Sequence, residues 1–174
     1  MPMPGLFNVE NALAAAAAAE VYGLPREAVV DGLARAFVPG RMEHYRSADG
    51  QVDVIVDYAH NGMSLEALLR SARLEFPGRP ITLLFGCTGG KGLDRRAGMG
   101  QAAGALADRI ILTEDDPGPE EVTAICADIG RYIAPSGKGC EQQQKRKNGP
   151  EPCVPDGMLA RRFLDQYNAR SGRG

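Results

Sequence analysis

Residues 52–60 read VDVIVDYAH, in which an apolar strand pattern ends abruptly in Asp57 and, three residues later, His60. In open α/β sheets, ligands bind at the carboxyl ends of the strands. Asp57 could bind a ribose hydroxyl there and His60 could contact a phosphate, but a polar strand end that binds nothing explains the same residues equally well. We therefore look for function at this edge of the predicted sheet.

Strand and helix patterns follow one another on both sides of this stretch. Upstream, GRME at residues 40–43 leads into a short strand at 43–47, and a turn at Asp49-Gly50 predicts a hairpin with strand 52–56. Downstream, the predicted elements are helix 64–75, strand 81–85, helix 96–106, strand 110–113 and helix 120–132. Strands that are apolar on both faces and are separated by amphipathic helices predict a parallel sheet with helices on both faces. The fold class is therefore α/β, with a Rossmann-like, mostly parallel sheet.

We expect residues 1–38 to be a helical segment distinct from a main domain at residues 39–174. A helix that begins near Asn8 runs through an alanine-rich stretch and stops at Gly23, and Pro25 then opens a second helix. Pro39-Gly40 breaks the helical pattern, as a linker does. Near the other end, a polar basic stretch precedes a predicted helix at 156–167.

Bulk composition favours small-molecule chemistry. The chain has 174 residues, 44% hydrophobic and 24% charged, and its formal net charge of -2 gives no global attraction to nucleic acid or to an anionic membrane. It lacks an apolar stretch of about 18 residues, as a membrane span needs, and we expect a cytoplasmic protein. Four widely spaced cysteines and only two histidines argue against a metal site and a disulfide scaffold.

A glycine-rich loop, GCTGGKG at residues 86–92, follows one predicted strand and precedes a helix. Backbone amides at such a position can bind a phosphate or a carboxylate. Three residues, not four, separate Gly86 from Gly90-Lys91, and Gly92 follows instead of Ser or Thr, so this is not a Walker A loop. It is not Gly-x-Gly-x-x-Gly either, which argues against a nicotinamide-dependent oxidoreductase. A tight corner between strand and helix is the alternative to an anion site.

Three acids, Glu114, Asp115 and Asp116, end the next predicted strand and should lie beside the glycine-rich loop. Such a cluster can hold a cation or an ammonium group. Solvated loop acids are equally common, so the cluster alone decides nothing.

In their order along the chain, these motifs resemble those of the Mur ligase family, ATP-dependent enzymes that form amide bonds in peptidoglycan synthesis. The resemblance is closest to the tripeptide synthetase type, which adds the third amino acid. The matching segments are FNVENA at 7–12, GRME at 40–43, VDYAH at 56–60, the loop and helix at 86–100, DDP at 115–117 and GKGCE at 137–141. The resemblance implies a Mur ligase C-terminal domain, preceded by a short helical remnant of the family's central ATPase domain.

Carried over position by position, the resemblance implies an ATP site and an amino-acid site. The ATP site would comprise Asn11 at the adenine, Arg41 as the catalytic residue at the phosphates, Asp57 at the ribose and His60 near the nucleotide. The pocket for the incoming amino acid would be lined by Lys91, Asp115, Asp116, Gly137 and Glu141.

The chemistry that the resemblance implies has two steps. ATP phosphorylates a substrate carboxylate, and the amine of the added amino acid attacks the resulting acyl phosphate. The implied cofactors are ATP and Mg2+, with the magnesium ligands on the missing central domain. The implied partners are UDP-N-acetylmuramoyl-L-alanyl-D-glutamate and a basic amino acid, whose ammonium group Glu141 would face. Nothing in the sequence indicates an oligomeric state.

Departures from the family pattern bear on which amino acid is added. Members that add diaminopimelate carry Asp-Asn-Pro-Arg at the acidic motif, and the arginine clamps the distal carboxylate. This chain has Asp116 in place of the asparagine and Gly118 in place of the arginine, and Lys91 stands where a second arginine of that pocket falls. Loss of a two-pronged clamp and gain of a carboxylate favour lysine or ornithine over diaminopimelate.

Two pieces of the family pattern are absent from the sequence. It contains neither a P-loop nor the family's magnesium ligands, so we expect the isolated chain to be inactive although its intact parent would be a ligase. Only Pro135 and Ser136 separate Ala134 from Gly137, where the family places a further helix and strand. The alternatives are a related folylpolyglutamate or cyanophycin synthetase domain, and a module that binds an amino acid or a partner ligase without chemistry.

Overall fold

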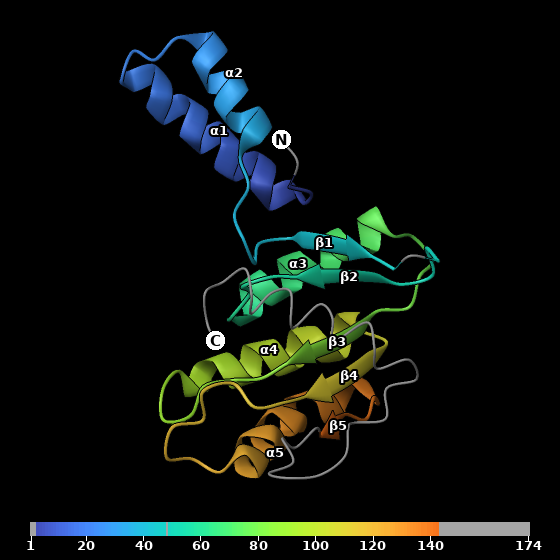
Figure 1. Cartoon of the computed structure of the whole chain (residues 1–174). Coiled ribbons are helices and arrows are strands. Elements are labelled where there is room, and N and C mark those ends of the chain that lie inside the picture. The colour runs from blue at the N-terminus through green and yellow to red at the C-terminus, as the bar shows by residue number, and fades with distance from the viewer. Residues whose placement is uncertain (1–2, 48, 143–174) are drawn as a thin grey trace. The chain divides into compact units, whose positions relative to one another are not determined.

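The computed structural model describes residues 3–47 and 49–142, in which helices and strands alternate after a helical start (Figure 1). The helices are α1 (Leu6–Val21), α2 (Arg26–Arg35), α3 (Gly62–Glu75), α4 (Leu93–Leu106) and α5 (Val122–Ile133), followed by a 3-10 turn at Ala134–Ser136. The strands are β1 (Glu43–Arg46), β2 (Asp53–Val56), β3 (Thr82–Phe85), β4 (Arg109–Leu112) and β5 (Glu141–Gln142). Residues 45–54 belong to a compact unit distinct from that of residues 3–44 and 55–142.

The first two helices, α1 and α2, contact each other and match the two predicted N-terminal helices. α1 ends at Val21, two residues before Gly23 adopts a left-handed φ of 68°, a conformation that glycine tolerates. Pro25 stands at the start of α2, where its carbonyl accepts the amide of Ala28 at 3.0 Å and its own missing N–H is not needed.

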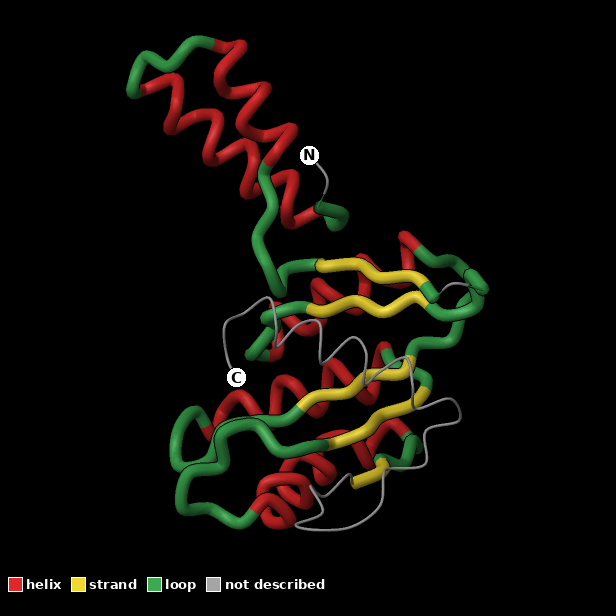
Figure 2. The backbone as a smooth tube through the Cα atoms, in the orientation of Figure 1, coloured by secondary structure: helices red, strands yellow, loops and turns green. Residues whose placement is uncertain are grey.

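A two-stranded hairpin is formed by β1 and β2 (Figure 2). The amide of Ser47 donates to the carbonyl of Val52 at 2.9 Å, and Asp49 accepts the amide of Gln51 at 3.0 Å within the turn. Arg46 Nε donates to Asp53 Oδ1 at 2.8 Å. The predicted hairpin is confirmed, and Asp49 supplies the side-chain hydrogen bond that aspartate often makes in turns.

The other strands form a parallel sheet in the order β3-β4-β5. Leu84 of β3 pairs with Ile111 of β4, and Ile111 pairs in turn with Glu141 of β5. The predicted α/β fold with a parallel sheet is confirmed. Within the described residues β1 and β2 pair only with each other, so the strands make two hydrogen-bonded sheets where a single sheet was expected.

One face of the three-stranded sheet is buried against α3, α4 and α5. The apolar cluster there includes Leu83, Phe85, Ile110 and Leu112 of the sheet, and Leu65, Leu69, Met99, Ala103, Ile125, Ile129 and Ile133 of the helices. The alternate residues of β3, Thr82 and Leu84, are exposed, so this strand alternates rather than being apolar on both faces. Helices were predicted on both faces of the sheet. Among the described residues, α3, α4 and α5 pack with the buried residues of one face. The helix predicted at 156–167 lies outside the described residues.

Local capping shifts the helix starts from those that periodicity predicts. Asn61 caps α3 by accepting the amide of Ser64 at 2.9 Å, so α3 begins at Gly62. α4 begins at Leu93, directly after Gly92 adopts a left-handed φ of 58°. The predicted starts at 64 and 96 were thus two and three residues late.

We expect Leu112→Ala to lower the free energy of unfolding by about 2–5 kcal/mol, because this side chain is fully buried and its removal leaves a cavity. Leu84→Ala is the matched control, since Leu84 is 56% exposed and its truncation should cost at most about 0.5 kcal/mol. Urea unfolding followed by circular dichroism measures both. Equal losses would contradict the one-sided burial of the sheet.

Candidate functional site

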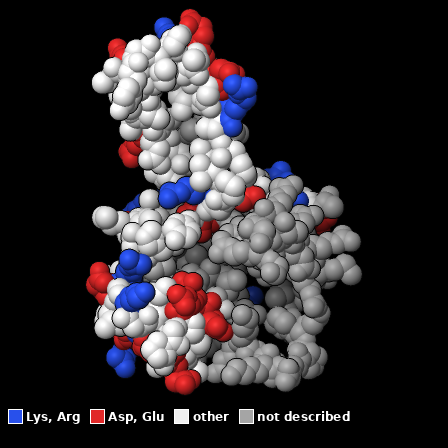
Figure 3. All heavy atoms as spheres, turned by 60° about the vertical axis from the view of Figure 1, so that its left-hand side comes forward, with Lys and Arg blue, Asp and Glu red and all other residues white. Residues whose placement is uncertain are grey.

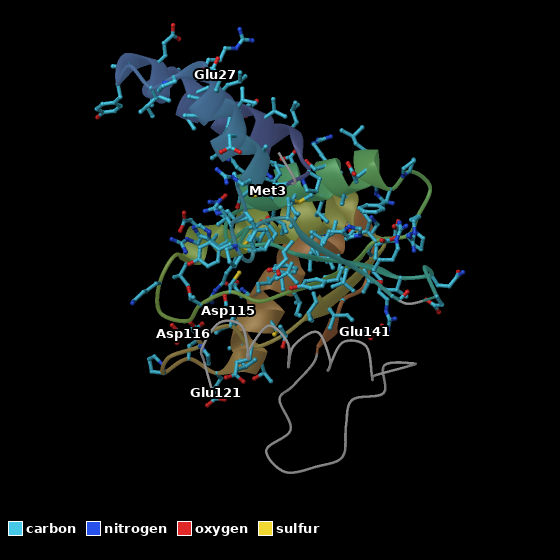
Figure 4. All side chains as sticks on the ribbon, turned by 45° about the horizontal axis from the view of Figure 1, so that its top comes forward. Met3, Glu27, Asp115, Asp116, Glu121 and Glu141 are labelled. Carbon is cyan, nitrogen blue, oxygen red and sulfur yellow. The ribbon has the colours of Figure 1, made fainter. Side chains whose placement is uncertain are left out.

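Two loops meet at the carboxyl edge of the three-stranded sheet: the glycine loop (residues 86–92), after β3, and the acidic turn (residues 114–120), after β4. They are neighbours because β3 and β4 are adjacent and parallel. The side chains of Lys91, Asp115 and Asp116 are exposed there, and the two aspartates lie together in Figure 4. Figure 3 turns this side of the sheet forward and shows acidic side chains gathered on its surface. The structure thus brings three of the predicted amino-acid-site residues to one edge.

The two loops are in backbone contact. The amide of Gly89 donates to the carbonyl of Asp116 at 3.1 Å. A Cβ on Gly89 would lie 1.8 Å from the carbonyl oxygen of Pro117, and one on Gly86 would lie 2.4 Å from that of Thr113. Only glycine allows this approach, so the glycines shape the edge by the side chains that they lack.

An ion pair between a buried arginine and a partly exposed glutamate, which the sequence analysis did not single out, joins α4 to the acidic turn. The side chain of Arg96 on α4 is 2% exposed. Its Nη1 and Nη2 donate to Glu120 Oε1 and Oε2 at 2.9 and 2.7 Å. Periodicity assigns Arg96 only to a helix, and no local pattern marks an arginine that will be buried.

Glu120 also accepts the amide of Gly90 at 3.0 Å. The hydrogen bonds from Arg96 and then from Gly90 lower the pKa of Glu120 from its usual 4.5 to about 2. Since the amides of Gly89 and Gly90 both donate within the protein, these two do not form part of an open anion cradle. The expectation that the glycine loop binds a phosphate is weakened accordingly.

The linker around Arg41 is held by two carboxylates. Asp57 Oδ2 accepts the amide of Met42 at 2.8 Å, and Asp57 Oδ1 accepts that of Ala59 at 2.8 Å. Glu43 accepts the amide of Gly40 at 3.0 Å. Met42 is buried with a left-handed φ of 47°, whereas Arg41 is exposed. Asp57 and Arg41 therefore lie close along this linker, and their ATP-site roles stay predictions.

His60 and Asn61 organise the turn between β2 and α3. His60 Nδ1 lies 3.0 Å from the carbonyl oxygen of Tyr58, so this nitrogen carries the hydrogen of that bond. Asn61 and Ser64 form a reciprocal capping box at the start of α3. The side chain of His60 is exposed, and its proximity to a nucleotide stays a prediction.

Asn11 lies on α1 with an exposed side chain. The buried asparagine of this helix is Asn8, whose Nδ2 donates to the carbonyl of Pro4 at 2.6 Å. The role of Asn11 at an adenine ring stays a prediction.

Gly137 and Glu141 do not join the other predicted amino-acid-site residues. Lys138 Nζ donates at 2.6 Å to the carbonyl of Ala107, which precedes β4, whereas Glu141 pairs in register with Ile111, the third residue of β4. Glu141 pairs with Arg109 at 3.0 Å for both oxygens. Figure 4 shows Glu141 apart from Asp115 and Asp116. The roles of Gly137 and Glu141 in an amino-acid pocket stay predictions.

Among the described residues, no group of three or more His, Cys, Asp and Glu side chains could hold a metal ion. Burial raises the pKa of the Cys87 thiol to about 11, so it stays protonated and is a poor nucleophile. In the described part of the chain, no helix combines the length and the apolar character that crossing a membrane requires.

The sequence matches a known protein family over the segment that contains these loops. A sequence model of the Mur ligase glutamate ligase domain matches residues 40–148, which include the hairpin, the glycine loop and the acidic turn. The chain belongs to the Mur ligase family. Its membership agrees with the resemblance drawn from the ordered motifs.

Several Mur ligases are similar in sequence. The chain is 34% identical over 94% of its length to the UDP-N-acetylmuramoyl-L-alanyl-D-glutamate:L-lysine ligase of Enterococcus faecalis, of which it covers 38%. It is 45% identical over 77% of its length to the 2,6-diaminopimelate ligase of Thermosynechococcus vestitus, of which it covers 27%. The chain therefore spans well under half the length of these relatives.

Solved structures agree on the fold of this Mur ligase chain. The structure of a UDP-N-acetylmuramoyl-L-alanyl-D-glutamate:2,6-diaminopimelate ligase aligns with a TM-score of 0.56 and 35% identity. The alignment covers 83% of this chain and 29% of that ligase. Folylpolyglutamate synthase of Mycobacterium tuberculosis, complexed with ADP and AMPPCP, aligns with a TM-score of 0.67 and 25% identity. The alignment covers 98% of this chain and 36% of that synthase.

We expect Gly89→Ala to destabilise the chain by about 1–3 kcal/mol, because the added methyl group must displace the carbonyl of Pro117. Gly139→Ala is the control, since nothing lies within 4 Å of its Cβ position. Thermal unfolding of the two variants tests the contact between the loops. A Gly89→Ala variant as stable as the control would show that the loops are not in backbone contact.

The hydrogen bonds that Glu120 accepts should be lost only at strongly acidic pH. The pKa of Glu120 is lowered in the folded state, so its contribution to stability is complete above about pH 4.5 and is lost as pH falls through about 2. Urea unfolding between pH 7 and pH 2 should therefore show a loss of stability in this window that is smaller in Glu120→Gln and unchanged in Glu121→Gln, its exposed neighbour. The carboxyls of Asp49, Asp108 and Glu141, whose pKa values are also lowered, supply the remaining loss. A Glu120→Gln profile parallel to the wild type would contradict this assignment.

Proposed function

We propose that this chain is the amino-acid-binding domain of a ligase that adds the third amino acid to UDP-N-acetylmuramoyl-L-alanyl-D-glutamate. The observation that carries the proposal is its 34% identity, over 94% of the chain, to a ligase whose name states that substrate and L-lysine. The exposed charges of Lys91, Asp115 and Asp116 at the carboxyl edge of the sheet supply a surface for a small charged ligand.

We infer that the added amino acid is lysine or ornithine rather than diaminopimelate. Both kinds of relative are similar to the chain, so overall identity does not decide the question. The argument rests on the acidic turn, where Asp116 offers a carboxylate and Gly118 offers no side chain. Two adjacent carboxylates attract a terminal ammonium group and repel the second carboxylate of diaminopimelate.

The ATP site proposed here combines the linker with the end of β2. Arg41 is exposed and its neighbours Gly40 and Met42 are held by Glu43 and Asp57, so a positive charge is presented from a fixed backbone. This arrangement suits a phosphate, and Asp57 retains lone pairs for a ribose hydroxyl. Bound ATP would supply the phosphoryl group that activates the substrate carboxylate. Arg41 would offset negative charge during that transfer, and Asp115 and Asp116 would orient the incoming amine.

The division at residue 38 is part of the same proposal. The helical pair α1 and α2 exposes large apolar side chains, including Leu6 at 68%, Val21 at 86% and Tyr22 at 84%. Surfaces of this kind usually pack against other protein. Residues 1–38 would therefore be the edge of a central ATPase domain that holds the P-loop and the magnesium ligands, and residues 39–174 the C-terminal domain. The chain alone would then bind without catalysing ligation.

A folylpolyglutamate synthase-like domain is the second candidate, favoured by the TM-score of 0.67 to the Mycobacterium tuberculosis enzyme. Glutamate would then be the amino acid bound. The carboxylates of Asp115 and Asp116 argue against it, because they would repel the carboxylates of glutamate.

Calorimetric titration of the chain with L-lysine, L-ornithine, meso-diaminopimelate and L-glutamate tests the proposal. We expect saturable binding of lysine or ornithine, weakened about tenfold by Asp116→Asn through loss of a charge-assisted hydrogen bond. Glu121→Gln controls for the general loss of negative charge. Tighter binding of diaminopimelate or glutamate would overturn the assignment of the amino acid.

A designed switch makes the test sharper. Asp116→Asn combined with Gly118→Arg restores the residues that the family uses for diaminopimelate, and should reverse the preference between lysine and diaminopimelate. Space is available, because nothing lies within 4 Å of a Cβ at Gly118, but its φ of 55° should cost roughly 1–2 kcal/mol of stability. Unfolding must therefore be measured beside binding. A stable double variant with unchanged preference would count against the acidic turn as the determinant.

A further inference from the structure

Arg96 is the most deeply buried charged side chain described in the core, with 2% exposure. A buried arginine is costly unless its hydrogen-bond donors are satisfied. Its Nε finds no hydrogen-bond partner among the described residues, so part of this cost is not recovered. In other proteins, apolar side chains of similar size often replace buried ion pairs without loss of stability.

The contacts of Arg96 converge on segments that are distant in sequence. Nη2 donates to the carbonyl of Thr88 at 3.2 Å as well as to Glu120, and Nη1 lies 3.4 Å from Asp128 on α5. One guanidinium thus links the glycine loop, the acidic turn and α5. The two-pronged pairing with Glu120 fixes the direction of approach as well as the distance.

Glu120, which Arg96 holds in place, is in turn hydrogen-bonded to the glycine loop. It accepts the amide of Gly90, while the amide of Gly89 is held by the carbonyl of Asp116. Lys91 follows directly, and Asp115 and Asp116 lie on the partner loop. The exposed charges of the candidate site therefore lie on loops whose backbone conformation depends on the pairing of Arg96 with Glu120.

We propose that Arg96 and Glu120 are positioning residues, which lock the glycine loop onto the acidic turn and so set the spacing of the charges that receive the incoming amino acid. This inference deepens the proposed function and rests on it for the identity of the ligand. The locking itself stands on the contacts of the two side chains alone.

Amide hydrogen exchange of the full chain, resolved by NMR, tests the locking without any ligand. In Glu120→Gln the amide oxygen can accept from Gly90 or from Arg96, and the amide nitrogen faces the guanidinium donors. We expect exchange at Gly90 to accelerate about tenfold or more, since its hydrogen bond to a charged carboxylate is lost. Exchange at Gly89, whose amide donates to the carbonyl of Asp116, should accelerate because the two loops are then no longer locked together. Exchange at Ala107, which bonds to Ala103 within 2.9 Å at the end of α4, should change little.

Further variants separate position from charge. Arg96→Met should free both loop amides, and Arg96→Lys should restore only part of the protection, because an ammonium group cannot reproduce the fork toward Glu120 and Thr88. Arg95→Met and Glu121→Gln, on exposed neighbours, are the matched controls. If Arg96→Met fails to fold, Glu120→Gln and Arg96→Lys still decide the matter.

The outcomes are distinct. Unchanged exchange at Gly89 and Gly90, or equal acceleration at Ala107, would overturn the proposal, because the pair would then contribute nothing or only global stability. Titration of Glu120→Gln with L-lysine should show affinity reduced about tenfold relative to Glu121→Gln. Wild-type affinity together with a loosened loop would also overturn it. If the wild-type chain binds none of the amino acids tested, the proposed function fails, and the exchange data still decide whether the pair locks the loop.

Discussion

Parallel pairing of β3 with β4 is the constraint on which the candidate site depends. Two parallel neighbours end at the same edge, so the loops that follow them must share that edge whatever their sequences. Here the loops approach so closely that Gly89 has no room for a side chain. The site is therefore a consequence of strand direction first and of loop chemistry second.

Burial of Arg96 adds order to this edge at some cost in stability. A salt bridge in the interior is weak evidence for stability, because desolvation consumes much of its Coulomb energy. What the Arg96–Glu120 salt bridge adds is a defined geometry. Two parallel hydrogen bonds from Arg96 fix the carboxylate of Glu120, and this carboxylate accepts the amide of Gly90. The exposed charges of the acidic turn and of Lys91 can therefore be placed without being buried themselves.

The linker before β1 is also held in place by a carboxylate, that of Asp57. Asp57, at the end of β2, accepts the amide of Ala59 in the turn that follows and that of Met42, which precedes β1 and has a left-handed conformation. A side chain that sequence reasoning assigns to a ribose is thus also a structural anchor. The two roles are compatible, because a carboxylate has more lone pairs than these two amides use.

Much of the fold follows from local pattern. The helix and strand order and the hairpin at Asp49 follow from periodicity and turn residues, because each depends on neighbours within a few residues. The alternation of strands and helices predicts the parallel sheet, and the order of the motifs along the chain resembles that of the Mur ligase family. Proximity of the glycine loop to the acidic turn also follows, since strand direction implies it. The pairing of Arg96 with Glu120 does not, because 24 residues separate them and periodicity marks neither. Nor does the placement of Glu141 opposite Ile111 of β4. That placement depends on which part of a short segment pairs with β4, and the register of a strand is decided by tertiary packing.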